Sequence, residues 1–216
     1  MADPRAVFDK LPTSTISDAL DRLGIAGQCR GLMPVFDRVH MCGPAYTLKY
    51  LPVGGEGGTV GDFLDDVPAG AVVAIDNAGR TDCTVWGDIM TFLAAKRGVA
   101  GTAINGICRD VDRSRDMKYP IFSVAYWMRT GKDRVRLVGV NVPVDLGGVS
   151  VDPGDLLVGD DNGLIAVPAK RAAEVAEVAA GIEETENKIR DAISQGMRLG
   201  DARKQLGYHT LQSKKK

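Results

Sequence analysis

The sequence has little or none of several residues and motifs that common active sites require. Among its 216 residues there are two histidines, His40 and His209, which argues against a zinc site built from several histidines. It also lacks the Gly-x-Ser-x-Gly elbow, the Walker loop and the Gly-x-Gly-x-x-Gly turn. The sequence therefore gives no sign of the hydrolases, phosphate-binding ATPases and dinucleotide-binding enzymes that these motifs mark.

Long apolar runs and an excess of charge are absent as well. There is no run of about 18 apolar residues, and residues 1–10 lack the apolar core of a signal peptide. The 27 Lys and Arg residues nearly cancel the 28 Asp and Glu residues, so binding to nucleic acid or to an anionic membrane is not indicated. The four cysteines show no paired spacing and are expected to be reduced thiols. We therefore expect a cytoplasmic protein with no nucleic-acid or membrane partner.

One stretch, residues 86–110, combines a helical pattern, a strand pattern and charged residues. Apolar residues recur at helical spacing over residues 88–97 and predict a helix there. Residues 102–107 are mostly apolar and bounded by glycine, which predicts a short buried strand. The charged pair Arg109 and Asp110 follows this strand directly.

The lengths of these segments indicate where the charged residues lie. A helix of about ten residues is roughly 15 Å long, and a strand of five or six residues runs back roughly 17–20 Å. Arg109 and Asp110 should therefore return beside Gly87 and Asp88, where the helix begins. Free amides at a helix start favour an anion, arginine can grip a carboxylate, and one or two carboxylates can hold Mg²⁺. Such a site fits a small 2-oxo acid that chelates a metal.

Spacing alone leaves an alternative open for the same residues. Arg109 and Asp110 can form an ordinary polar turn, and Asp88 can serve as an N-terminal helix cap. Cys108, next to the proposed site, can be a packed structural thiol or a reactive one.

The rest of the chain alternates predicted strands and helices before short strands cluster. The segment 76–80 is expected to be a loop leading into the helix at Asp88, and the glycine-rich segment 54–58 a loop bordering the site. Thr13 or Ser14 is expected to cap the first helix. Helices are predicted over residues 16–23, 61–67, 111–117 and 169–194, strands over 45–51, 71–75, 121–126 and 135–142, and a hairpin over 156–159 and 164–167.

Several short motifs resemble the RraA-like family, which contains the class II 4-hydroxy-4-methyl-2-oxoglutarate / 4-carboxy-4-hydroxy-2-oxoadipate aldolases. Together they span most of residues 14–170, and their combination is more specific than any one fragment. The motifs are Asp76-Asn77-Ala78-Gly79, Trp86-Gly87-Asp88, Lys96-Arg97-Gly98-Val99-Ala100-Gly101, Asn105-Gly106-Ile107-Cys108-Arg109-Asp110, Val142-Pro143-Val144, Gly147-Gly148-Val149, Pro153-Gly154-Asp155 and Gly159-Asp160-Asp161-Asn162-Gly163.

The resemblance implies a β-sandwich core with flanking helices, of the swivelling phosphohistidine-domain type. We therefore expect one α/β domain over residues 1–216, with a compact mixed β-sandwich core at about 14–168 and a C-terminal helical arm at about 169–211. The resemblance also implies a homotrimer, or a homohexamer of stacked trimers, with sites at subunit borders.

The resemblance further assigns roles to the charged residues. It implies that Asp110 is the carboxylate that binds Mg²⁺ or Mn²⁺. It implies that Arg109 grips the pyruvyl group at its keto or enolate oxygen, while the amides from Gly87 to Met90, Ile89 included, hold the pyruvate carboxylate. Asp88 would position a metal-bound or proton-carrying water. Arg109 and Asp88 are thus the expected catalytic residues, and Gly87, Asp88, Ile89, Met90 and Arg109 the expected substrate contacts.

These roles imply a metal-dependent lyase, a class II aldolase that releases pyruvate from a 4-hydroxy-2-oxo acid or diacid. The reaction is a retro-aldol cleavage through a metal-stabilised pyruvate enolate. Oxaloacetate decarboxylase activity is expected too, because loss of CO₂ gives the same enolate. The alternative is a non-catalytic regulator that binds a protein partner, as the RraA branch inhibits ribonuclease E. Asp110 favours an enzyme, since that branch loses the acidic residue after the arginine. A methyltransferase is not favoured, because no glycine-rich loop is present to hold S-adenosylmethionine.

Overall fold

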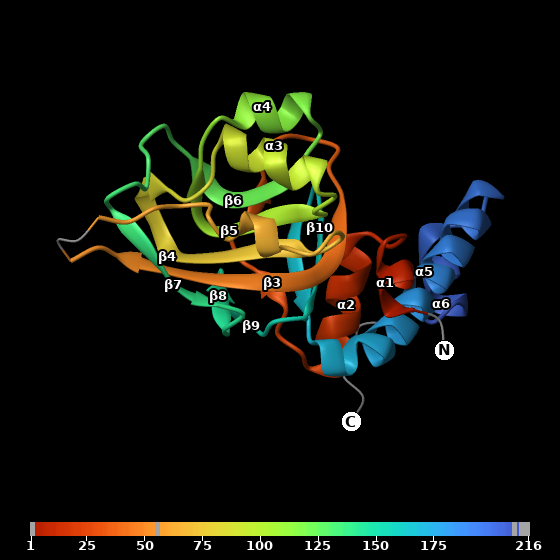
Figure 1. The fold of residues 1–216 in the computed structure, drawn as a ribbon. Coiled ribbons are helices and arrows are strands. Elements are labelled where there is room, and N and C mark those ends of the chain that lie inside the picture. The colour runs from red at the N-terminus through yellow and green to blue at the C-terminus, as the bar shows by residue number, and fades with distance from the viewer. Residues whose placement is uncertain (1–2, 55–56, 209–210, 212–216) are drawn as a thin grey trace.

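The structure is a computed structural model that describes residues 3–54, 57–208 and 211. Its main sheet has the strand order β1-β11-β10-β3-β4-β5-β6-β2, and β7 pairs with β3. In Figure 1, α3 and α4 cover one face of the sheet, while α1, α2, α5 and α6 gather at one end. The strands are β1 (Gln28–Cys29), β2 (Met33–Pro34), β3 (Met41–Pro52), β4 (Val72–Thr84), β5 (Gly101–Cys108), β6 (Ile121–Tyr126), β7 (Val135–Val140), β8 (Val144–Leu146), β9 (Val149–Val151), β10 (Leu156–Asp160) and β11 (Gly163–Val167). The helices are α1 (Pro4–Phe8), α2 (Thr13–Leu23), the 3₁₀ helix η1 (Leu64–Asp66), α3 (Asp88–Lys96), α4 (Val111–Asp116), the 3₁₀ helix η2 (Ala169–Arg171), α5 (Ala172–Ser194) and α6 (Leu199–Gln205).

The centre of the sheet is parallel. β3 pairs in parallel with β4, β4 with β5, and β5 with β6. The beginning of β3 also pairs antiparallel with β10, and its end pairs antiparallel with β7, so this one strand joins the parts of the sheet. Parallel strands place their carboxyl ends at one edge, where ligand sites form in α/β proteins. The chain leaves β4 and β5 at that edge and enters α3 and α4.

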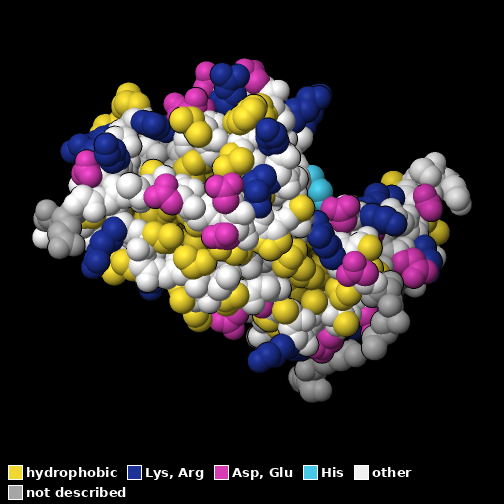
Figure 2. All heavy atoms as spheres, viewed as in Figure 1, with side chains coloured by type: hydrophobic (Ala, Val, Ile, Leu, Met, Phe, Trp, Pro, Cys, Tyr) yellow, Lys and Arg dark blue, Asp and Glu magenta, His cyan; other side chains and the backbone are white. Residues whose placement is uncertain are grey.

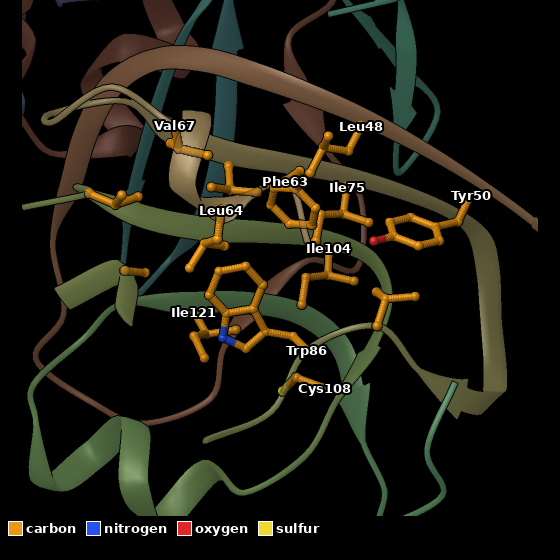
Figure 3. Packing of buried hydrophobic residues seen from close by; sticks show 14 of the residues in the cluster. Leu48, Tyr50, Phe63, Leu64, Val67, Ile75, Trp86, Ile104, Cys108 and Ile121 are labelled. Atoms are coloured by element: carbon orange, nitrogen blue, oxygen red, sulfur yellow. The ribbon is translucent and has the colours of Figure 1, made fainter. Parts of the chain in front are cut away.

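Three groups of buried apolar side chains make the core. The first lies between the sheet and α3, and Figure 3 shows Trp86 there among Leu64, Ile104 and Ile121. The second lies on the opposite face, where β3 to β6 pack against the β8–β9 hairpin, β10 and β11. The third joins β10 and β11 to α1, α2 and α5. Strands therefore pack on strands across one layer and on helices across the others, which confirms the expected mixed α/β class.

The C-terminal helix is present as predicted, although it begins at Ala172 after the 3₁₀ turn η2. Its buried residues Val175, Ile182 and Ile189 lie on one face, and the helix packs against α2 and α1. Packing of this helix on a neighbouring subunit stays a prediction, and His209 lies outside the described residues. Within those residues, no helix is both long and apolar enough to cross a membrane.

The loop predicted at residues 76–80 is wrong, because β4 continues through this segment to Thr84. Ala78 and Gly79 adopt positive φ angles of 53° and 65°, and the pairing of β4 with β5 shifts register between Asp76 and Arg80. This irregularity accommodates polar residues that resemble a loop in sequence, while the strand resumes beyond it. The short helix predicted over 61–67 is also smaller, being the single 3₁₀ turn η1.

The start of α2 differs from the prediction as well. Thr13 is the first helical residue and not the cap. The carboxylate of Asp160, at the end of β10, accepts hydrogen bonds from the backbone N–H of Thr13 at 2.8 Å and from its hydroxyl at 2.6 Å. Asp160 thus caps α2 from a distant part of the chain, which local sequence patterns do not reveal.

Replacing Asp160 by asparagine should lower stability at neutral pH by about 1 kcal/mol, because the amide keeps one acceptor oxygen and loses the second hydrogen bond from Thr13 together with the negative charge. Burial raises the pKa of Asp160, but hydrogen bonds from Thr13 and Asn162 outweigh it and hold the pKa below its ordinary value. A lowered folded-state pKa stabilises the fold above the unfolded-state pKa, and this contribution disappears as pH falls through the folded-state value. Urea unfolding at pH 7 and at a pH well below the ordinary aspartate pKa of 3.8 measures this. The variant and the wild type should converge at the acidic end, and an unchanged difference would contradict the assignment.

Candidate active site

The segment that leads into α3 is fixed by a buried tryptophan. The Trp86 ring stacks on Tyr119, with centroids 6.2 Å apart and planes 2° from parallel. Its indole Nε1–H donates to the Thr91 hydroxyl at 3.0 Å, and that hydroxyl donates to the Gly87 carbonyl at 3.1 Å. Thr84 accepts from the Trp86 backbone N–H at 3.3 Å. These contacts hold the start of α3 in one position, as a preorganised anion site requires.

The charged pair after β5 returns to this start, as the segment lengths predict. The backbone N–H of Arg109 donates to the Trp86 carbonyl at 3.0 Å. The backbone N–H of Asp88 donates to Oδ2 of Asp110 at 3.1 Å, and Nε of Arg109 lies 3.2 Å from the same oxygen. A carboxylate, a guanidinium and the N-terminus of α3 therefore meet at one point.

Asp110 reaches α3 because its backbone turns sharply. It has a left-handed conformation with φ 57° and ψ 42°, and it precedes α4 without capping that helix through its side chain. The side chain crosses to α3 instead. Both of its contacts use Oδ2, and no hydrogen bond within the described residues uses Oδ1. The side chain is 38% exposed, so this second oxygen can take a further ligand.

Gly87 is the residue that permits this close approach. A Cβ atom at this position would lie 2.9 Å from Oδ2 of Asp110 and 3.2 Å from Nε of Arg109. The backbone at Gly87 is extended, with φ −148°, so any residue could adopt its conformation. The requirement for glycine is therefore one of space beside the two charged side chains.

A cavity of about 370 Å³ opens beside these groups. The expected substrate contacts Gly87, Asp88, Ile89, Met90 and Arg109 all line it, while Asp110 lies behind Gly87. The other described residues of its wall are Val60, Gly61, Asp62, Leu64, Asp65, Thr84, Trp86, Leu93 and Thr130.

Most of those further wall residues were not predicted from the sequence. Thr84 and Thr130 meet through an isolated β-bridge between segments far apart in the chain, for which the sequence carries no signal. The wall from Val60 to Asp65 follows the glycine-rich segment 54–58 that was expected to border the site. Residues 55–56 of that segment lie outside the described residues.

The donor set near Asp110 suits a cation that takes few protein ligands. No group of three or more His, Cys, Asp or Glu side chains is arranged to hold a metal ion in the described part of the chain. Mg²⁺ commonly binds through one or two carboxylates and completes its octahedron with water and substrate oxygens. The carboxylate of Asp110, with Asp88 next to it, is compatible with that mode.

Neighbouring groups have structural partners. Arg80 donates to both carboxylate oxygens of Asp82, at 2.8 and 2.7 Å. Asp76 is buried and accepts from the Ala78 backbone N–H at 2.8 Å. Cys108 is fully buried, and burial raises the pKa of its thiol to about 11. It is therefore a protonated, packed thiol at neutral pH, which agrees with the structural interpretation of this residue.

A family model called RraA-like, described as Aldolase/RraA, matches residues 13–166. Protein DlpA of Legionella pneumophila is 38% identical over 199 residues, which are 91% of this chain and 32% of that protein. The chain thus spans about a third of the length of this curated relative. A protein of Halalkalibacterium halodurans named putative 4-hydroxy-4-methyl-2-oxoglutarate aldolase is 31% identical, covering 88% of each chain. The crystal structure of an uncharacterized protein from Pseudomonas syringae pv. tomato superposes with a TM-score of 0.87 at 41% identity, covering 93% of this chain and 96% of that one.

Proposed function

Because the chain belongs to the RraA-like family, we propose that it is a lyase that releases pyruvate from a 4-hydroxy-2-oxo acid. The observation that carries the proposal is the meeting of Arg109, Asp110 and the N-terminus of α3 beside a cavity that Arg109 and the helix start line. The name of the Halalkalibacterium halodurans relative supports an aldolase in general terms. Oxaloacetate decarboxylase activity is part of the same proposal, since both reactions leave the pyruvate enolate.

The proposed roles follow from what each group can bind. The free backbone amides at the start of α3 and the positive end of its dipole favour the substrate's 2-oxo carboxylate. The guanidinium of Arg109 donates to the 2-oxo oxygen, where negative charge grows as the C3–C4 bond breaks. Asp88, in the first turn of α3, holds the water that takes the C4 hydroxyl proton. A retro-aldol cleavage requires these three functions: binding of the carboxylate, stabilisation of the enolate oxygen and removal of the hydroxyl proton.

Asp110 is the residue proposed to hold a divalent cation, Mg²⁺ or Mn²⁺. Its Oδ1 is the available ligand atom, while Oδ2 stays bound to α3 and to Arg109. The cation supplies Lewis acidity, because its positive charge draws electron density from the 2-oxo group and lowers the cost of forming the enolate. Asp110 thus both places the cation and aligns the helix start with the guanidinium.

We also propose that the chain forms homotrimers or homohexamers. Apolar side chains interrupt the charged surface over α3 in Figure 2, and Phe92 on that helix is 57% exposed. Tyr126, the last residue of β6, and Met128 beyond it are 61% and 71% exposed. Large exposed apolar side chains of this kind favour burial against another subunit. Sedimentation velocity gives the mass that distinguishes these states from a monomer.

A second candidate function is that of a regulator that binds a protein, because the family description names RraA beside aldolase and a solved relative from Streptomyces coelicolor is described as a member of the RNase ES inhibitor RraA protein family. The carboxylate of Asp110 favours the lyase. The Asp110 side chain does not cap its own helix α4 and instead contacts α3 and Arg109. This position suits the binding of a cation. A protein-binding surface alone does not require it.

Pyruvate release is the measurement that tests the proposal. We expect the purified chain to release pyruvate from oxaloacetate and from 4-hydroxy-4-methyl-2-oxoglutarate with Mg²⁺ or Mn²⁺, and EDTA to reduce the rate to the uncatalysed level. A coupled lactate dehydrogenase assay follows the product continuously. Rates that are the same with metal and with EDTA would contradict the metal-dependent part. Absence of release across a wider panel of 2-oxo acids would favour the regulator.

A further inference from the structure

We propose that the cavity selects 4-hydroxy-2-oxo acids whose substituent at C4 is uncharged and apolar, and disfavours those with a second carboxylate there. This inference rests on the proposed function, because it assumes that the pyruvyl end of the substrate lies against Arg109 and the start of α3. It concerns the remaining part of the same cavity. 4-Hydroxy-4-methyl-2-oxoglutarate carries a carboxylate at C4, so we expect the chain to cleave it more slowly than a substrate that carries only an alkyl group there.

Apolar side chains form much of the wall beyond the helix start. Val60 and Leu64 line it on one side, and Met90 and Leu93 on the other. Ile89, also in this wall, is 78% exposed although it belongs to the first turn of α3. The core of the protein leaves that side chain uncovered, at the place where a substrate substituent would meet it. An alkyl group there would remove apolar surface of both partners from water.

Charge in the same wall is unfavourable for a second carboxylate. Among the described residues that line the cavity, Arg109 is the sole cation, and its guanidinium already faces Asp110 and the pyruvyl position. The carboxylates of Asp62 and Asp65 lie in the wall as well. Like charges repel, so these two carboxylates oppose the binding of a further carboxylate in the cavity.

The two acids differ in how far they are neutralised. Asp65 lies 3.7 Å from the guanidinium of Arg97, which offsets part of its charge. Asp62 accepts a hydrogen bond from the Thr59 hydroxyl at 2.6 Å and has no ion pair among the described residues. Asp62 is therefore the residue that we assign to rejection of a C4 carboxylate.

Arg80 and Arg97 do not change this balance of charge, because neither lines the described cavity. Arg80 donates to Asp82 from Nε and from Nη2. Arg97 contacts Asp65 through both its side chain and the backbone carbonyl. Neither cation is placed to receive a second carboxylate.

The reaction itself does not discriminate between C4 substituents, so the residues that line the cavity determine the choice of substrate. In the retro-aldol step the C4 hydroxyl loses its proton and C4 becomes a carbonyl carbon. The C3–C4 bond breaks, its electron pair forms the enolate of pyruvate, and a proton then adds at C3. The C4 substituent takes no part in these bond changes, so discrimination between substituents arises mainly from their contacts with the cavity.

A matched pair of substrates tests the inference. 4-Hydroxy-2-oxopentanoate carries a methyl group at C4, and 4-hydroxy-2-oxoglutarate carries a carboxylate at the same carbon. We expect kcat/KM for pyruvate release to be at least about tenfold higher with the methyl compound, in line with the discrimination that apolar pockets and unpaired charges produce. Equal values, or a preference for the diacid, would overturn the proposal.

Two variants assign the effect to Asp62. Asp62→Asn should raise kcat/KM for the diacid by about threefold to tenfold and leave the methyl compound nearly unchanged, and Asp62→Lys should raise it further. Asp66→Asn is the matched control, because Asp66 is an exposed acid of η1 outside the cavity wall. A gain with Asp66→Asn equal to that with Asp62→Asn, or no gain with either Asp62 variant, would contradict the assignment.

Proton exchange separates failure of this inference from failure of the proposed function. Pyruvate has no C4 substituent, so metal-dependent exchange of its methyl protons with D₂O, followed by NMR, reports enolate formation alone. Exchange together with preferred cleavage of the diacid would overturn the selectivity and keep the lyase. Absence of both exchange and cleavage would overturn the proposed function, and this inference with it.

Discussion

An Asp110→Asn variant should release pyruvate about 10²–10³-fold more slowly than the wild type at saturating Mg²⁺. Asparagine has nearly the same shape and tolerates the left-handed backbone at this position, so the fold should persist. It removes the negative charge that would hold the cation and face Arg109. Loss of one preorganised electrostatic group typically costs about this factor. Steady-state rates over a range of Mg²⁺ concentrations, with circular dichroism to verify folding, measure the effect.

Asp112→Asn is the control for that variant. Asp112 lies in the first turn of α4, is exposed and does not line the cavity. Its replacement removes the same charge two residues further along and should change the rate by less than about twofold. If Asp110→Asn were as active as Asp112→Asn, the cation would have to bind elsewhere.

An Arg109→Lys variant should lose about 10²-fold in kcat/KM although it keeps its positive charge. A guanidinium presents donors in a planar fork, whereas an ammonium is a point charge on a flexible stem. The fork lets Arg109 face Oδ2 of Asp110 through Nε while its terminal nitrogens remain for the substrate. Because the lost interaction is strongest when the enolate forms, the loss should fall mainly on kcat. Initial rates of pyruvate release across substrate concentrations separate kcat from KM.

Arg113→Lys provides the comparison for the arginine variant. Arg113 is an exposed residue of α4 that does not line the cavity, and the same chemical change there should leave both constants within about twofold. A drop of similar size in both variants would indicate a general effect of arginine on α4 and its surroundings. A loss confined to KM at Arg109 would assign it to binding alone.

The meeting of α3 with the end of β5 was predictable because it depends on lengths and periodicity. Helix and strand nearly cancel in length, so the position of Arg109 and Asp110 beside Gly87 and Asp88 followed from local patterns alone. The roles of these residues needed the family resemblance in addition. Spacing indicated their position and left open the alternative that they form an ordinary polar turn.

Features that depend on distant segments were not predictable in the same way. β4 continues through Asp76 and Arg80 because β5 offers it hydrogen-bond partners, a tertiary effect that overrides loop-like composition. The cap of α2 comes from Asp160, far along the chain. Thr130 enters the cavity wall through a bridge to Thr84. Each is set by a neighbour in space that local sequence does not specify.

The left-handed backbone at Asp110 also restricts how this site could be lost over time. Most amino acids pay roughly 1–2 kcal/mol to adopt such a conformation, whereas glycine and asparagine adopt it readily. A descendant that abandoned the chemistry and kept the turn would therefore most easily carry Asn or Gly at this position. One residue would then separate lyases from partner-binding proteins of the same shape, and a single substitution could begin that conversion without unfolding the chain.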